Sequence, residues 1–206
     1  MEKVYKLSWD LSHSGDPEKD AFHLPFKNEN EFGVDIISLR EFELPEQIYF
    51  QANFNLIPKY DYPLTSLEVP VVSKRILEIL NSLGDFSFRL IPVIMIDDTY
   101  FSELFDANNR LNSNVPVNTS YSIIQIMSYT EVFDYENSIF EEDFILPVGH
   151  IDKLVLKKPQ NGFPPIFRIQ EKASEIFISK EAKEALELAN IKGCVFEEVE
   201  VTPYEG

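Results

Sequence analysis

The stretch VVSKRILEIL (Val71–Leu80) occurs a second time, in altered form, as FISKEAKEAL (Phe177–Leu186). Each copy consists of a short apolar run, a Ser-Lys step and a segment whose apolar residues recur at helical spacing. Ser73 and Ser179 are expected to cap the two helices, because a serine hydroxyl accepts a hydrogen bond from a free N–H of the first turn. This pattern predicts a scaffold and carries no chemistry of its own.

The residues that follow each copy complete the predicted fold. Gly84 follows the first helix and Gly193 the second, and a further apolar run comes after each glycine. Glycine is suited to the end of a helix and to the turn back into a strand. The sequence therefore predicts an α+β fold with mixed or mainly antiparallel sheets and two strand-helix-strand units, around 71–95 and 175–201.

Length and composition limit the class of protein. A chain of 206 residues with 44% hydrophobic residues is long enough to bury a core. We expect a single α+β domain over 1–206, with two pseudo-repeated halves of about 1–100 and 101–206 as a further option. The single cysteine, Cys194, excludes an intramolecular disulfide and is typical of a reducing compartment.

Three other apolar segments are relevant to the fold. Val4–Trp9 alternates and predicts an opening strand, and Ile48–Ile57 predicts another. Val34–Leu39 is a third apolar segment. The amino-terminal residues show no basic segment followed by an apolar one, so no signal peptide is predicted and the protein is expected to be cytoplasmic.

The formal charge is −17, from 18 basic and 35 acidic residues. Such a charge repels nucleic acid and anionic membranes and attracts basic partners. More than half of the excess lies between Arg89 and Lys153, where Arg110 is the only basic residue. The acids of this interval are Asp97, Asp98, Glu103, Asp106, Glu131, Asp134, Glu136, Glu141, Glu142, Asp143 and Asp152.

Acids and aromatic residues alternate between Glu131 and Asp143, where Phe133, Tyr135 and Phe140 are interleaved with carboxylates. This mixture suits a protein interface, since rings supply buried anchors and charges set approach and register. It suits equally a solvated edge segment whose rings turn inwards.

Enzymatic chemistry has little support in the sequence. The motifs of phosphate-binding loops, dinucleotide-binding folds, zinc proteases and serine hydrolases do not occur. Asp97-Asp98 follows an apolar run, where a carboxylate pair either binds a metal or begins a turn. One alternative is therefore a metal-dependent hydrolase that uses Asp97, Asp98 and one of the three histidines, which are His13, His23 and His150. No cofactor is expected.

The order of segments resembles a family of bacterial immunity proteins from polymorphic-toxin systems, formerly catalogued as a domain of unknown function. An amino-terminal Tyr/Trp strand, the first copy after Pro70, the Ile166–Ile169 step and the second copy carry this resemblance. It implies a cytoplasmic, non-enzymatic protein that binds and neutralises a cognate toxin. It implies no catalytic residue.

We therefore predict an immunity protein whose acidic surface meets a basic face of a protein toxin. An acidic adaptor without a toxin partner is the other alternative. The predicted partner-binding residues are Asp97, Asp98, Glu131, Phe133, Asp134, Tyr135, Glu136, Phe140, Glu141, Glu142 and Asp143.

Overall fold

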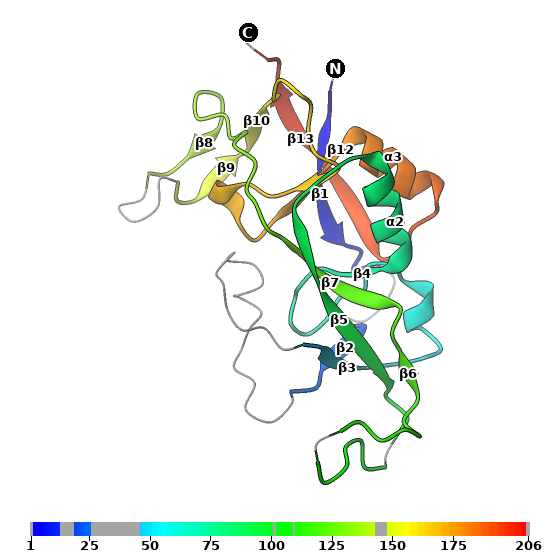
Figure 1. Cartoon of the computed structure of the whole chain (residues 1–206). Coiled ribbons are helices and arrows are strands. Elements are labelled where there is room, and N and C mark those ends of the chain that lie inside the picture. Colours follow the sequence, from blue (N-terminus) through cyan, green and yellow to red (C-terminus); the bar gives the residue numbers. More distant parts are fainter. Residues whose placement is uncertain are drawn as a thin grey trace.

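The computed structural model describes residues 2–12, 19–25, 46–100, 102–108, 110–142 and 148–204. Two sheets and the helices α2 (Lys74–Leu83) and α3 (Lys180–Leu188) form the body of this part of the chain (Figure 1). The predicted α+β class is confirmed, with strand more abundant than helix. The apolar segment Val34–Leu39 lies outside the described residues.

The first sheet has the amino-terminal strand at its centre. β1 pairs antiparallel with β12 on one side and with β13 on the other. β10 joins β13 in parallel, and β11 joins β12 antiparallel. In sheet order the bounds are β10 (Val155–Lys157), β13 (Cys194–Thr202), β1 (Val4–Trp9), β12 (Ile176–Ser179) and β11 (Ile166–Phe167).

The second sheet is mixed. β3 and β5 run parallel, whereas the pairings of β2 with β3, β5 with β7 and β7 with β4 are antiparallel. β6 pairs with the far end of β5. The bounds are β2 (Ala21–His23), β3 (Ile48–Ala52), β5 (Phe88–Asp97), β7 (Tyr121–Ile126), β4 (Val71–Ser73) and β6 (Val117–Asn118).

The two copies of the repeated stretch form the same local structure. Ser73 Oγ accepts from Ile76 N at 3.4 Å and Ser179 Oγ accepts from Ala182 N at 3.2 Å, so both predicted caps are confirmed. In each copy the strands on either side of the helix are separated in the sheet by a third strand. β7 lies between β4 and β5, and β1 lies between β12 and β13.

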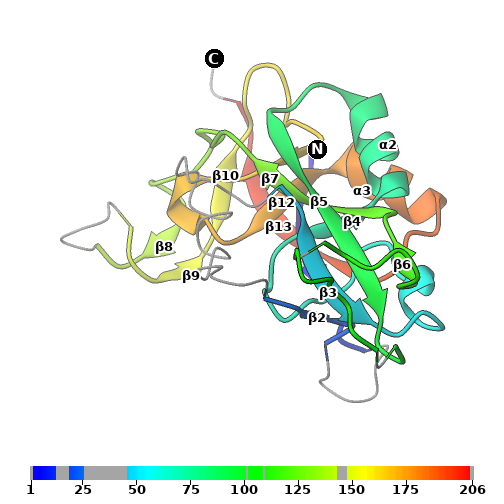
Figure 2. The same ribbon diagram turned by 60° about the horizontal axis from the view of Figure 1, so that its bottom comes forward.

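Helices α2 and α3 lie against each other and against both sheets (Figure 2). Their apolar sides share one core cluster with Tyr5 and Leu7 of β1 and with Ile124 and Ile126 of β7. Val4 points to the other face of β1, where a second cluster includes Phe167, Phe177 and Phe133. Because side chains alternate between the two faces of β1, this single strand contributes residues to both cores.

A short turn before β13 connects the two copies. Asp61 N and Tyr62 N both donate to Lys192 O, at 2.9 and 3.1 Å. The Asp61 carboxylate accepts from Ser73 Oγ at 2.8 Å and from Lys192 N at 3.1 Å. The cap of α2 is thus tied directly to the turn that follows α3.

Gly193, in this turn, has φ +91°, and a Cβ placed on it would lie 2.7 Å from Tyr62 O. We expect Gly193→Ala to lower the free energy of unfolding by roughly 2–4 kcal/mol, because the backbone is strained and an atom overlaps a carbonyl. Gly162→Ala is a matched control, since Gly162 has φ +77° but its Cβ would meet only the flexible end of Glu2. Gly162→Ala should lower the free energy of unfolding by only about 1 kcal/mol. If urea denaturation gave the same loss of unfolding free energy for both variants, overlap with Tyr62 O would not be the cause of the destabilisation.

Two short strands form a ribbon at the side of the molecule remote from α2 and α3. β8 (Ile139–Phe140) pairs antiparallel with β9 (Ile151–Lys153). Both views place this ribbon beyond β10, at the edge of the first sheet (Figures 1 and 2). The candidate site lies beside it.

Candidate functional site

The three aromatic residues singled out in the sequence form one cluster. Ring centroids are 4.7 Å apart for Phe133 and Tyr135, 5.6 Å for Phe133 and Phe140, and 5.9 Å for Tyr135 and Phe140, all edge-to-face. Phe133 is buried, Phe140 is half-buried and Tyr135 is 49% exposed. The cluster thus rests on the core through Phe133 and reaches solvent through Tyr135.

Backbone pairing holds this segment against β10. Phe133 forms an antiparallel bridge with Leu156, and Asp134 N donates to Val155 O at 3.0 Å. Phe133 also belongs to the cluster that covers one face of the first sheet. It therefore supports the site from within and exposes only a small part of its ring.

Asp134 lies in the interior, which corrects its expected place on an acidic surface. Its side chain is 0% exposed and accepts from Thr202 Oγ1 at 2.7 Å, from Asn137 Nδ2 at 2.9 Å and from the N–H groups of Glu136 and Asn137 at 3.1 Å. Burial by itself would raise the pKa of Asp134, but these hydrogen bonds outweigh it and hold the pKa below its ordinary value. Asp134 organises the turn that positions Tyr135.

A polar groove of about 480 Å³ lies beside Tyr135. Tyr135 Oη donates to Glu171 Oε1 at 2.5 Å, which fixes the phenol at the groove wall. This hydrogen bond, together with burial and the charge of Glu171, raises the pKa of Tyr135 to about 12. The groove is lined by Tyr129, Thr130, Glu131, Phe133, Tyr135, Gln170 and Glu171.

The surface around Tyr135 is acidic. Glu131, Glu136, Glu141 and Glu142 are exposed. Within the described part of the chain, Glu136 lies 4.0 Å from Lys157 Nζ, and no basic side chain pairs with the other three. Ile139, 57% exposed, adds an apolar side chain on β8. We call the exposed Glu131, Tyr135, Glu136, Ile139, Glu141 and Glu142, together with the half-buried Glu171, the acidic-aromatic surface. Asp143 lies outside the described residues.

Asp97 and Asp98 lie in a different part of the molecule from Tyr135. Asp97 is the last residue of β5, and both views show that end of β5 far from the β8–β9 ribbon (Figures 1 and 2). Asp97 Oδ1 accepts from Thr99 N at 2.9 Å and from Thr99 Oγ1 at 2.8 Å, so this carboxylate closes a turn. The two aspartates therefore do not share a surface with Tyr135.

Among the His, Cys, Asp and Glu residues that the structure describes, no group of three or more is arranged so that it could bind a metal ion. His23 lies on β2 with its ring against Phe50, and His13 falls outside the described residues. Burial raises the pKa of the Cys194 thiol to about 12, so Cys194 is protonated at neutral pH.

Comparison with known families finds a match over the carboxy-terminal part of the chain. Residues 101–201 match the sequence model of a family of immunity proteins, which confirms the resemblance over that part of the chain. The family is Imm11, described as an immunity protein family. The whole acidic-aromatic surface lies within the matched residues. No curated protein matches the chain. In the described residues, no helix is both long and apolar enough to span a membrane.

Proposed function

We propose that this chain binds and neutralises a cognate bacterial toxin of a polymorphic-toxin system, and that the acidic-aromatic surface makes the contact. The observation that carries the proposal is the match to the Imm11 family over residues 101–201, the part of the chain that contains this surface. It acts as one domain in the cytoplasm, without a cofactor, and without contact to nucleic acid or membrane.

The chemistry of the surface supports a partner with a basic face. Glu131, Glu141 and Glu142 are exposed and have no basic partner in the described part of the chain. Carboxylates that are not neutralised within their own chain steer a basic partner towards the surface and speed association. A basic face of this kind surrounds the substrate channel of a nuclease. A protein that covers such a channel would inhibit the nuclease without any catalytic step of its own.

Tyr135 has the properties of an anchor residue. It is 49% exposed, its ring packs on Phe133 and Phe140, and its hydroxyl is held by Glu171. A side chain that is already fixed loses little conformational entropy on binding. Exposed aromatic residues surrounded by polar groups are the usual centres of binding energy in protein interfaces.

The experiment that tests the proposal is co-expression of this protein with the product of the adjacent gene, scored for cell survival and for co-purification. Rescue together with a complex whose stability falls with added salt would support direct neutralisation. Rescue without a complex would contradict binding as the mechanism. A toxic partner that is neither bound nor neutralised would overturn the proposed function.

Replacing the anchor should weaken the complex. We expect Tyr135→Ala to raise the Kd for the toxin by about 30-fold or more, the effect of losing a hot-spot ring. Tyr135→Phe keeps the ring and loses one hydrogen bond, so its effect should stay below about tenfold. Tyr204→Ala is the matched control, since Tyr204 is 51% exposed and lies after β13. Calorimetry that gave the same loss for Tyr204→Ala would contradict the anchor role.

A further inference from the structure

The polar groove beside Tyr135 carries negative charge that its own walls do not neutralise. Glu131 and Glu171 both line it, and none of the described residues that line it is basic. Within the described part of the chain, neither carboxylate is paired with a lysine or an arginine. The charge of Glu171 also contributes to the raised pKa of Tyr135, so the negative field is present at the groove wall. Such a groove favours a cationic occupant.

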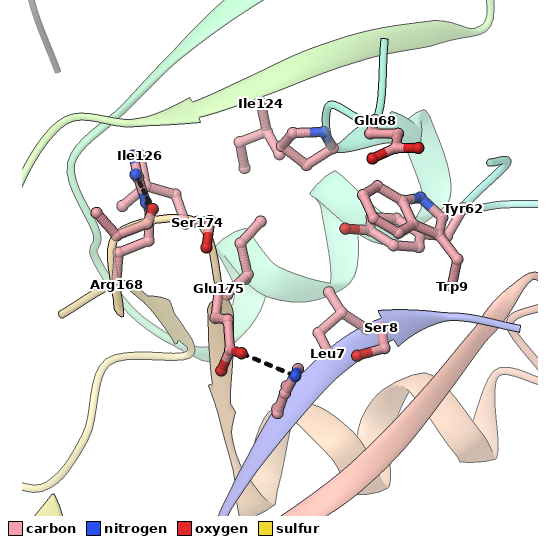
Figure 3. A pocket seen from close by; sticks show the side chains of 14 residues that line it. Leu7, Ser8, Trp9, Tyr62, Glu68, Ile124, Ile126, Arg168, Ser174 and Glu175 are labelled. Atoms are coloured by element: carbon pink, nitrogen blue, oxygen red, sulfur yellow. Dashed lines mark hydrogen bonds and ion pairs between the residues drawn. The ribbon is translucent and has the colours of Figure 1, made fainter. Parts of the chain in front are cut away.

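Arg168 and Lys172 are the cations closest in sequence to Glu171, and neither lines the groove. Arg168 is buried and belongs to the wall of a separate cavity of about 260 Å³, where its guanidinium donates to Ala173 O at 2.8 Å (Figure 3). Lys172 Nζ pairs with Glu175 Oε1 at 3.5 Å. Two carboxylates at the groove thus stand against one buried cation behind it, and the remaining negative charge is left for a partner to neutralise.

The other groups of the groove wall suit a guanidinium better than an ammonium. The Thr130 hydroxyl and the Gln170 amide offer hydrogen-bond acceptors beside the two carboxylates. Arginine presents five N–H donors in one plane, whereas lysine presents a single compact ammonium. A guanidinium also stacks on aromatic rings, and the chain contains an example, since Arg168 Cζ lies 5.4 Å from the centroid of the Tyr129 ring. Tyr135, 49% exposed, offers a second ring at the same groove.

We propose that this groove receives the side chain of an arginine on the toxin, with the guanidinium bound by the carboxylates of Glu131 and Glu171 and packed against the ring of Tyr135. The inference rests on the proposed function, because the partner supplies the arginine. It specifies what the basic face of the partner presents at this point, which is a planar and permanently charged group with several donors. An ion pair inside a groove is also screened less by salt than a pair on an open surface.

The first test uses three small probes and needs no toxin. They are N-acetyl-arginine methylamide, its lysine counterpart, and its citrulline counterpart, in which a neutral urea of nearly the same shape replaces the guanidinium. Backbone amide signals of the ¹⁵N-labelled full chain report where each probe binds. We expect the arginine probe to cause saturable shifts confined to the groove residues Thr130, Glu131, Gln170 and Glu171. It should bind about threefold or more tightly than the lysine probe and about tenfold or more tightly than the citrulline probe.

Two double variants make the result specific. Glu131→Gln with Glu171→Gln removes both charges of the groove, yet an amide oxygen at position 171 can still accept from Tyr135 Oη. This variant should bind the arginine and citrulline probes within about twofold of each other. Glu181→Gln with Glu197→Gln is the control, since both residues are exposed and lie outside the groove. It should keep the affinity for the arginine probe within about twofold.

Three results would overturn the groove inference. They are an equal loss of affinity in the two double variants, shifts spread over acidic residues outside the groove, and binding of the lysine or citrulline probe as tight as that of the arginine probe.

Measurements with the toxin distinguish this inference from the proposed function. Glu171→Gln should raise the Kd of the complex by about fivefold or more, and one toxin arginine replaced by lysine should cause a similar loss that does not add to the first. A normal complex together with a groove that rejects the arginine probe would overturn the inference and leave the proposed function standing. A groove that binds the probe, in a protein that neither binds nor neutralises the toxin, would overturn the proposed function and with it the toxin as the source of the arginine.

Discussion

Reversing Glu131, Glu141 and Glu142 to lysine is expected to slow association with the proposed toxin partner by about 10- to 100-fold at low salt, because these carboxylates attract a basic partner to the proposed contact surface. The dissociation rate should change much less. The rate constants are measured by stopped flow or surface-based kinetics at several salt concentrations. The salt dependence of association should also weaken, since fewer charges remain to be screened.

A control variant with the same change of charge distinguishes an effect of the acidic-aromatic surface from an effect of the net charge. Glu78, Asp85 and Glu181 are exposed and lie on or beside α2 and α3, on the side away from the β8–β9 ribbon. Reversing these three changes the formal charge from −17 to −11, the same change as in the test variant. The control should associate within about threefold of the unmodified protein. If both triple variants slow association equally, net charge rather than the acidic-aromatic surface guides the encounter.

Replacing Asp134 with alanine is expected to lower the free energy of unfolding by about 3 kcal/mol, because several donors then lose their acceptor in a buried site. Asp134→Asn keeps the shape and one acceptor oxygen and should lose about 1–2 kcal/mol. Asp152→Ala, at an exposed position of β9, should stay within about 0.5 kcal/mol. Urea denaturation at neutral pH checks all three values.

The pH dependence of the free energy of unfolding tests the contribution of Asp134 independently. The pKa of Asp134 is lower in the folded protein than in the unfolded chain, so the folded state binds fewer protons. Its stabilising contribution is therefore complete above the unfolded pKa of about 3.9 and is lost as the pH falls through the lower folded value. The Asp134→Asn variant should lose less stability than the unmodified protein between about pH 5 and pH 3. An identical pH dependence would show that the pKa of Asp134 is the same in the folded and unfolded states.

Local features of the fold were predictable from the sequence because their causes lie within a few residues. Ser73 and Ser179 cap helices through bonds to residues three positions later, and the helices follow from apolar spacing. Phe133, Tyr135 and Phe140 were expected to act as a group, and they lie together. Their separation is at most seven residues, so a short turn is enough to bring the rings into contact.

The parts that the sequence did not predict depend on distant contacts. Tyr135 is held by Glu171, 36 residues away, and no pattern in either segment indicates that bond. Asp134 was grouped with the surface acids by charge alone, but its environment depends on Thr202. Asp97 and Asp98 were assigned to the same surface by a charge count along the chain, which takes no account of their position at the end of β5, in the other sheet.

The place of β1 in the first sheet has a consequence for synthesis. β1 ends at Trp9, yet its two neighbours, β12 and β13, begin only at Ile176 and Cys194, so more than 160 residues are made between them. At about 5–20 residues per second, the amino-terminal strand waits roughly 10–40 s for them. The first sheet therefore cannot form while the intervening residues are being made, and until then both edges of β1 lack the partners that they have in the folded protein.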